Sequence, residues 1–166
     1  MQGEWMRGDV QLITATIAFG MGVDKGEVRC VVHWGPPSSI SAYAQESGRA
    51  GRDGETAYAR IFYSARDRDV ILALLYNNNK SNLVNEFKRV IRFCEAGEDC
   101  RHKVITDFFG DSEPACVNMC DICKNKDIVR NKLHMFLNGD TNLALSHRHA
   151  NLELANVIKN KFYMKK

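Results

Sequence analysis

The sequence predicts an α/β fold in which part of a parallel-sheet lobe is followed by a smaller, helical subdomain. Short apolar runs alternate with a helix-like segment over residues 1–67, and strands that alternate with helices are typical of parallel sheets. Helix-like apolar spacing continues through residues 68–127, where five of the six cysteines lie. A basic extension, residues 128–166, completes the expected three-part organisation.

Three strands and one helix are expected in the first part of the chain. The strands are short apolar runs, namely residues 10–13, 28–34 and 57–63. Ser38 or Ser39 can cap a helix that ends at about Gly48, between the second and third strands. A strand–loop–strand–helix–strand order predicts a parallel sheet with its functional loops at one end.

The second part and the extension are expected to be helical. Residues 67–75 and 83–95 show the apolar spacing of helices that pack on one face. Two more helices are predicted in the extension, over residues 128–137 and 152–162. No run of 18 or more apolar residues is present, so no membrane partner is expected.

A decapeptide at residues 45–54, Gln-Glu-Ser-Gly-Arg-Ala-Gly-Arg-Asp-Gly, places two arginines among glycines. Guanidinium groups stay charged at neutral pH and match phosphate oxygens with a planar fork of donors. Glycines let the backbone approach a polyanion closely. Taken alone, the decapeptide is equally a glycine-rich turn with two solvated arginines. Residues 14–25, Thr-Ala-Thr-Ile-Ala-Phe-Gly-Met-Gly-Val-Asp-Lys, precede it and predict a strand-to-loop transition with exposed polar groups.

Together these two segments resemble motifs V and VI of the superfamily-two helicases, in the form used by RecQ-like DNA helicases. Gln45-Glu46 stands where the RNA-helicase version of motif VI usually begins with His-Arg, which favours the DNA-helicase branch. The resemblance runs from about Trp5 to about Asp127, and it implies that the first part of the chain is the C-terminal part of a RecA-like lobe.

Four of the six cysteines have the spacing of a zinc site. Cys116, Cys120 and Cys123 form a Cys-x3-Cys-x2-Cys motif, and Cys100 lies 16 residues before it. Four thiolates bind Zn²⁺ tetrahedrally and complete a closed structural site. A disulfide framework is the alternative, but the N-terminus carries no secretory signal and helicase motifs imply a reducing compartment.

The resemblance extends to these cysteines. RecQ-like helicases carry a four-cysteine zinc subdomain after motif VI, which opens with Cys-Arg and closes with Cys-Asp-x-Cys. Cys100-Arg101 and Cys120-Asp121-Ile122-Cys123 fit this pattern, and the spacing looks closest to the type-five branch.

The other candidate ligands are expected to play structural roles. Cys94 could compete with Cys100 for the first ligand position, but it lies in an apolar run and is expected to be a small buried hydrophobic residue. Cys30, on a predicted central strand, receives the same interpretation. His102 is not expected to be a ligand if four cysteines suffice.

The resemblance also implies an ATP site and residue roles within it. The whole motor would use ATP with Mg²⁺ to unwind DNA in the 3′-to-5′ direction. Arg52 matches the arginine finger, and Arg49 would contact phosphate or hold the lobe interface. Gln45 would sense nucleotide, and Asp24 matches the motif V acid that bonds the ribose hydroxyl.

DNA contacts are implied for motif V and are possible for the extension. Thr16 and the backbone around Gly20 and Gly22 would touch DNA phosphates. From Lys124 onward the chain has nine Lys/Arg and three Asp/Glu, a net of +6, although the whole chain is only +3. This basic extension is either a DNA-contacting surface or an ordinary solvated helix face.

The sequence contains neither G-x4-GK-[ST] nor Asp-Glu-x-His, the motifs that hold the phosphates and Mg²⁺ in a complete motor. The first helicase lobe is therefore an expected partner, and the chain alone is expected to be inactive. A nuclear DNA helicase of repair, recombination or replication is the expected whole protein. The alternative is a non-catalytic, zinc-dependent DNA- or protein-binding module.

Overall fold

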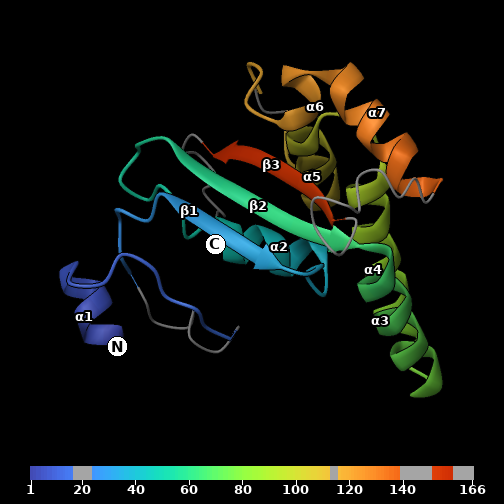
Figure 1. Ribbon diagram of the computed structural model, residues 1–166, viewed down its shortest axis with the longest axis horizontal. Helices are drawn as coiled ribbons and strands as arrows, with labels where there is room; N and C mark the ends of the chain where they lie inside the picture. Colours follow the sequence, from blue (N-terminus) through green and yellow to red (C-terminus); the bar gives the residue numbers. More distant parts are fainter. Residues whose placement is uncertain (17–23, 113–115, 139–150, 159–166) are drawn as a thin grey trace.

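The computed structural model describes residues 1–16, 24–112, 116–138 and 151–158, and of residues 151–158 only the backbone. A three-stranded sheet crosses the molecule in the order β1 (Cys30–Trp34), β2 (Ala57–Ser64) and β3 (Asn151–Ile158) (Figure 1). The predicted DNA contacts of Gly20 and Gly22 lie outside the described residues.

The first two strands and the helix between them form a β–α–β unit, as predicted. β1 runs parallel to β2, with Cys30 opposite Tyr58 and Trp34 opposite Phe62. Helix α2 (Ile40–Ser47) connects them, and the Ala42 backbone N–H donates to the Ser39 hydroxyl oxygen at 3.0 Å. This N-cap satisfies one of the free donors of the first turn, which explains why the helix begins here.

The prediction of a buried strand over residues 10–13 is wrong. The segment is extended but belongs to no strand, and Val10 and Leu12 are 41% and 77% exposed. A strand needs a neighbour to satisfy its backbone N–H and C=O groups. Among the described strands none pairs with this segment, so Val10 and Leu12 remain in solvent and Ile13 is only half-buried.

The prediction of a helix over residues 152–162 is wrong for its described part. Residues 151–158 form β3, which pairs antiparallel with β2 so that Ala57 lies opposite Ile158 and Ser64 opposite Asn151. Leucines at alternate positions, Leu152 and Leu154, also fit a strand. The edge of β2 that faces away from β1 supplies the backbone partners, and this tertiary pairing decides between the two patterns.

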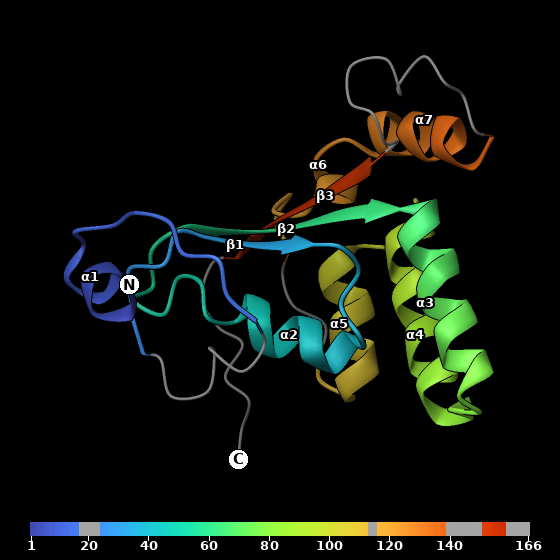
Figure 2. The ribbon, with the colours of Figure 1, turned by 60° about the horizontal axis from the view of Figure 1, so that its bottom comes forward.

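Different helices cover the two faces of the sheet. Figure 2 shows α2 and α5 (Arg101–Phe109) on one side of the sheet, and α6 (Asp121–Lys124) and α7 (Lys126–Leu137) on the other, over β3. Alternate residues of β2 are fully buried, namely Ala57, Ala59, Ile61 and Tyr63.

The prediction that Cys30 is buried is wrong. On β1, Trp34 is 85% exposed, and Cys30 is exposed as well. Cys30 shares its outward face with Trp34, because side chains alternate along a strand.

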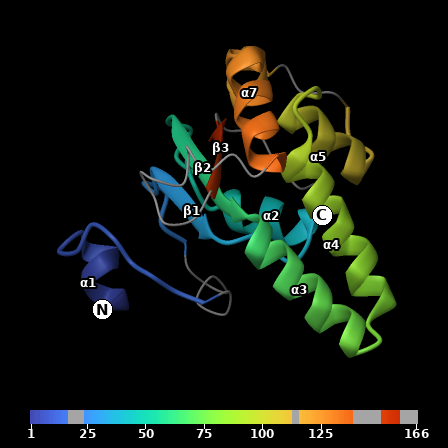
Figure 3. The ribbon, with the colours of Figure 1, turned by 45° about the vertical axis from the view of Figure 1, so that its right-hand side comes forward.

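The helical part follows β2 directly. Helices α3 (Ala65–Asn77) and α4 (Ser81–Glu95) form an antiparallel hairpin (Figure 3), and α1 (Gln2–Arg7) lies near the N-terminus. The buried face of α4 agrees with its predicted apolar spacing and consists of Val84, Phe87, Val90, Phe93 and Cys94. Cys94 is completely buried, which confirms its structural interpretation, and burial raises the pKa of its thiol to about 12.

One hydrophobic core connects the sheet with the helical part. The rings of Tyr43 on α2 and Phe93 on α4 lie 5.3 Å apart, and those of Tyr63 on β2 and Phe136 on α7 lie 5.7 Å apart. Paired aromatic rings contribute stability beyond the area that they bury. None of the described helices is both long and apolar enough to span a membrane.

Candidate functional site

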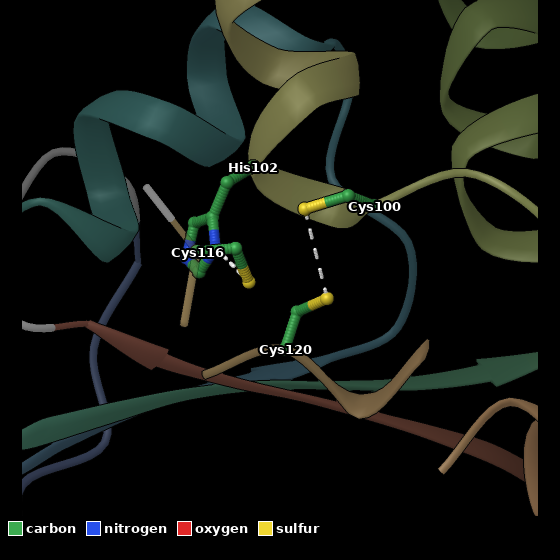
Figure 4. Close-up of side chains that lie close together, drawn as sticks. All are labelled: Cys100, His102, Cys116 and Cys120. Atoms are coloured by element: carbon green, nitrogen blue, oxygen red, sulfur yellow. Dashed lines mark hydrogen bonds between the residues drawn. The ribbon is translucent and has the colours of Figure 1, made fainter. Parts of the chain in front are cut away.

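A cluster of metal-binding side chains lies at the starts of α5 and α6. The donor atoms of Cys100, His102, Cys116 and Cys120 all lie within 4.8 Å of one another (Figure 4). Cys100 is the N-cap of α5 and Cys120 is the N-cap of α6. Thiolates are favoured at helix N-termini, because the free backbone N–H groups and the helix dipole stabilise negative charge there.

The distances between sulfur atoms fit a tetrahedral zinc site. The Sγ atoms of Cys100 and Cys120 are 3.9 Å apart. Two sulfurs that each lie about 2.3 Å from one tetrahedral Zn²⁺ are separated by about 3.8 Å. This chemistry and spacing fit the closed structural zinc site expected from the cysteine pattern.

His102 lies closer to Cys116 than it would if both residues were ligands of the same zinc ion. Its Nδ1 lies 3.0 Å from Cys116 Sγ, a hydrogen-bond distance. A nitrogen and a sulfur that share one tetrahedral Zn²⁺ are about 3.5 Å apart. The shorter distance suits a ring N–H that donates to a cysteine sulfur, and such contacts orient metal ligands from outside the coordination sphere.

Cys123 belongs to the same group of thiols. Its backbone N–H donates to Cys120 Sγ at 3.3 Å. Burial, followed by interactions with the Cys120 and Cys100 thiols, raises the pKa of Cys123 well above its usual value. Burial also raises the pKa of Cys116 to about 11, together with hydrogen bonds to the Cys100 and Cys120 thiols. Crowded thiols resist deprotonation, and a bound divalent cation would favour their thiolate forms.

A buried ion pair holds the two halves of the cluster together. Arg101 is 1% exposed, and its Nε and Nη2 donate to the Asp121 carboxylate at 3.1 and 3.2 Å. Its Nη1 donates to the Phe93 carbonyl oxygen on α4. Arg101 and Asp121 each follow a cluster cysteine directly, so this two-pronged contact fixes the starts of α5 and α6 relative to each other.

The predicted arginine motif is a tight turn at the end of α2. At Gly48 an added Cβ would lie 2.9 Å from the Ala44 carbonyl oxygen, closer than side chains tolerate. Gly51 has φ of +67°, a left-handed conformation that favours glycine, and its N–H donates to the Val28 carbonyl oxygen at 2.9 Å. The glycines therefore let the loop fold back against Val28, just before β1.

The structure brings two of the predicted ATP-site residues together. Arg52 Nη1 lies 2.7 Å from Asp24 Oδ1, and the Asp24 side chain is 84% exposed. Gln45 is exposed and Arg49 is half-buried at the C-terminal end of α2, and Thr16 is exposed on the extended N-terminal segment. The structure therefore joins the motif V acid to the second arginine of the decapeptide.

Residues beyond the predicted set also organise the two motif segments. Arg29 pairs with Asp53, the residue after Arg52. His33 Nε2 lies 2.7 Å from Glu46 Oε2, which joins β1 to α2. Asp53 and Glu46 stand inside the decapeptide, but Arg29 and His33 come from outside both motif segments, and no spacing rule in the sequence pairs them with it.

Two family models match most of the chain. The model described as "Helicase conserved C-terminal domain" matches residues 3–54, and the model described as "RecQ zinc-binding" matches residues 65–124. The first match contains both motif segments, and the second contains the cysteine cluster.

Curated relatives agree with both matches. The chain is 42% identical over 146 residues to ATP-dependent DNA helicase Q5 of Rattus norvegicus, which covers 80% of this chain and 15% of that protein. It is 44% identical over 130 residues to ATP-dependent DNA helicase hus2/rqh1 of Schizosaccharomyces pombe, which covers 74% and 10%. RecQ-like DNA helicase BLM of Xenopus laevis is 40% identical over 119 residues, which covers 68% and 9%. The chain therefore spans about a seventh or less of these relatives.

Proposed function

The chain belongs to the RecQ-like helicase family, and from this premise we propose that it forms part of an ATP-dependent 3′-to-5′ DNA helicase. It would supply motifs V and VI of the second RecA-like lobe and a structural zinc subdomain. The contact between Arg52 and Asp24 carries this proposal, because it joins two segments that are far apart in sequence into one candidate nucleotide site. A phosphate-binding loop from a first lobe would complete that site.

Arg52 is proposed as the arginine finger. Its guanidinium would neutralise charge on the transferring γ-phosphate, an effect of about 10³–10⁵ in rate in related phosphoryl transfers. Asp24 would bond the ribose hydroxyl, Arg49 would contact phosphate or the lobe interface, and Gln45 would sense nucleotide. Thr16 and the backbone near Gly20 and Gly22 would contact DNA phosphates, which position the strand without reading its sequence.

The zinc ion would be held by four thiolates, those of Cys100, Cys116, Cys120 and Cys123. The spacing of the Cys100 and Cys120 sulfurs supports two of these ligands, and the cysteine pattern of the sequence supports Cys123. The short contact between His102 and Cys116 supports a positioning role for His102. When bound, the ion would link the starts of α5 and α6 and so stabilise the helical subdomain.

The decisive experiment compares this chain alone with a two-lobe protein, in which a first helicase lobe carrying the phosphate-binding loop precedes the chain. The chain alone should show no DNA-stimulated ATP hydrolysis, and the two-lobe protein should. Turnover by the pure chain would contradict the assignment of ATP hydrolysis to two lobes. An inactive, well-folded two-lobe protein that still binds DNA with zinc would instead favour a non-catalytic binding module.

In the two-lobe protein, Arg52→Ala should lower kcat by about 10³-fold or more while ATP binding is largely kept. The charge that Arg52 would neutralise develops mainly in the transition state, so kcat should change far more than KM. Arg60→Ala is the matched control, because Arg60 lies on β2 outside both motifs. Equal, mild effects of the two substitutions would contradict a catalytic role for Arg52 and indicate that the arginine loop is only a glycine-rich turn.

The proposal extends to a nuclear protein of DNA repair, recombination or replication. Relatives named DNA helicases occur in a mammal and in fission yeast, which supports a role in eukaryotic chromosomes. Fluorescence microscopy of the tagged protein tests it, and a signal that stays outside the nucleus would exclude it.

A further inference from the structure

The Arg29 guanidinium contacts both segments of the candidate nucleotide site. Its Nη2 donates to the Gly26 carbonyl oxygen at 3.2 Å, and its Nε donates to the Glu27 carbonyl oxygen at 3.1 Å. Its Nη1 donates to the Thr56 carbonyl oxygen at 3.3 Å, and Nη2 also forms an ion pair with the Asp53 carboxylate. One side chain therefore joins the segment after Asp24 to the segment after Arg52.

Backbone contacts run beside this side chain. The Gly51 N–H donates to the Val28 carbonyl oxygen at 2.9 Å, and the Tyr58 N–H donates to the Arg29 carbonyl oxygen at 2.8 Å. Asp53 in turn accepts from the Glu55 N–H at 3.1 Å. Arg29 thus lies where the two segments meet. Its planar guanidinium donates to three carbonyl oxygens and one carboxylate at once, which the single ammonium group of a lysine could not do.

An ordinary surface ion pair would not have this arrangement. Such pairs join two flexible side chains and contribute little, because solvent screens them. Here three of the acceptors are backbone carbonyl groups, whose positions define the course of both loops. The Asp53 carboxylate stays ionised beside Arg29, because the hydrogen bond from Arg29 lowers its pKa.

The second link between the same loops is an ion pair between two side chains. Arg52 and Arg29 are similarly exposed, at 37% and 41%, but the Asp24 side chain is 84% exposed whereas that of Asp53 is 30% exposed. An incoming phosphate could replace the Asp24 carboxylate as a partner of Arg52. The Arg29 contacts would persist during this exchange, since they do not involve Arg52 or Asp24.

We propose that Arg29 is a positioning residue for the arginine finger. It holds the loop of residues 51–56 against residues 24–29, so that the backbone of Arg52 stays fixed while its side chain moves from Asp24 to a phosphate. This inference rests on the proposed function of Arg52. A displacement of about 1 Å in a catalytic group can lower turnover by about 100-fold. Loss of the Arg29 contacts is expected to lower turnover by up to this amount.

The first test uses the whole 166-residue chain and needs no ATP hydrolysis. Amide hydrogen exchange at Gly51, Gly54 and Glu55 is measured by NMR in the parent and in Arg29→Ala. Loss of the brace should speed exchange at these amides by about threefold or more, while α4 and the zinc content remain unchanged. Arg60→Ala is the control and should leave all of these amides unchanged. Unchanged exchange in Arg29→Ala, or faster exchange that extends through α4, would overturn the positioning role.

The second test measures ATP turnover in the two-lobe protein. Arg29→Ala should lower kcat by about 10- to 100-fold with little change in the KM for ATP. Arg29→Lys keeps the charge but not the fork, so its kcat should lie between those of the parent and Arg29→Ala. Values of kcat equal to that of Arg60→Ala in both variants would overturn the inference. If the parent two-lobe protein has no ATPase activity, the proposed function fails, and the exchange measurement alone decides whether Arg29 braces the loops.

Discussion

At the residue scale, residues next to the cysteines connect the parts of the chain that carry the cluster. Arg101 follows Cys100 and Asp121 follows Cys120, and their buried ion pair links α5 directly to α6. His102 adds a hydrogen bond to the Cys116 sulfur. In Cys-Arg-His and Cys-Asp-x-Cys, the residues that directly follow Cys100 and Cys120 therefore pair with each other, and His102 contacts a third cysteine of the cluster.

Removal of one partner of the buried pair should destabilise the protein strongly. Arg101→Ala leaves the Asp121 carboxylate without its partner, and breaking a buried pair in this way costs about 3–5 kcal/mol. Urea unfolding of the zinc-loaded chain measures the free energy of unfolding. Arg130→Ala is the control, because Arg130 pairs with Glu98 in solvent and should change stability little. Equal losses in the two variants would show that the Arg101 contact contributes no more than a surface pair.

At the element scale, β2 is the strand on which the rest of the sheet depends. It pairs parallel with β1 along one edge and antiparallel with β3 along the other, and its inward residues are fully buried. The pairing with β3 brings a segment from far along the chain onto the lobe. It also covers an edge of β2 that would otherwise offer unpaired backbone groups to other molecules.

Proline substitutions at two adjacent positions distinguish β3 from the helix that the sequence predicts. In an antiparallel edge strand, successive N–H groups point alternately toward the partner and away from it. Asn156→Pro and Val157→Pro should therefore differ, with one variant much less stable than the other in thermal unfolding. Both positions lie beyond the first turn of the predicted helix, where proline costs about 3 kcal/mol at either position. Equal destabilisation by the two prolines would thus contradict the strand.

The sequence predicts those parts of the molecule that local patterns determine. Ser39 caps α2 as expected, and α4 buries the face that its apolar spacing indicates. The cysteine spacing predicts a cluster, and the structure brings Cys100, Cys116 and Cys120 together, because ligand type and spacing are local properties. Residues 10–13 and 151–158 could not be assigned correctly, because strand formation depends on a partner elsewhere in the chain. The Arg29 contacts were missed for the same reason, since they join segments that meet only in the folded protein.

At the scale of the whole molecule, the metal cluster and the sheet share one core. Aromatic contacts connect α2 with α4 and β2 with α7, so the helical part is packed onto the lobe. Cys120 of the cysteine cluster and Ala50 of the arginine loop are both buried in this core. This arrangement suits a subdomain whose metal stabilises the lobe beside it.

Zinc removal should unfold the region of α5, α6 and α7. The purified chain should hold one Zn²⁺, and a chelator should lower its melting temperature and speed hydrogen exchange over residues 100–137, because structural zinc contributes directly to folding. Cys123→Ser should lose zinc, whereas His102→Ala should weaken zinc binding by about 10- to 100-fold. Cys30→Ser, at an exposed position on β1, is the control. A zinc-free chain of unchanged stability, or greater zinc loss in His102→Ala than in Cys123→Ser, would contradict the four-thiolate site.

The basic extension has two roles to separate, since α7 both packs on the core and carries lysines. Val129, Leu133 and Phe136 are buried, so deletion of α7 would damage the fold, whereas Lys132 on α7 and Lys124 at the end of α6 are exposed. If these lysines lie along DNA, their joint replacement by alanine should weaken duplex binding.

The expected size of that effect follows from counterion release. Each lost phosphate contact should reduce the slope of log affinity against log salt by about 0.9, independent of DNA sequence. Lys80→Ala is the matched control, because Lys80 lies at the tip of the α3–α4 hairpin, far from α7 in Figure 1. Fluorescence anisotropy across a salt series measures both quantities. Unchanged affinity and slope in the double variant would make α7 a solvated cover of the core, and the DNA contacts would then lie on the motif V side of the molecule.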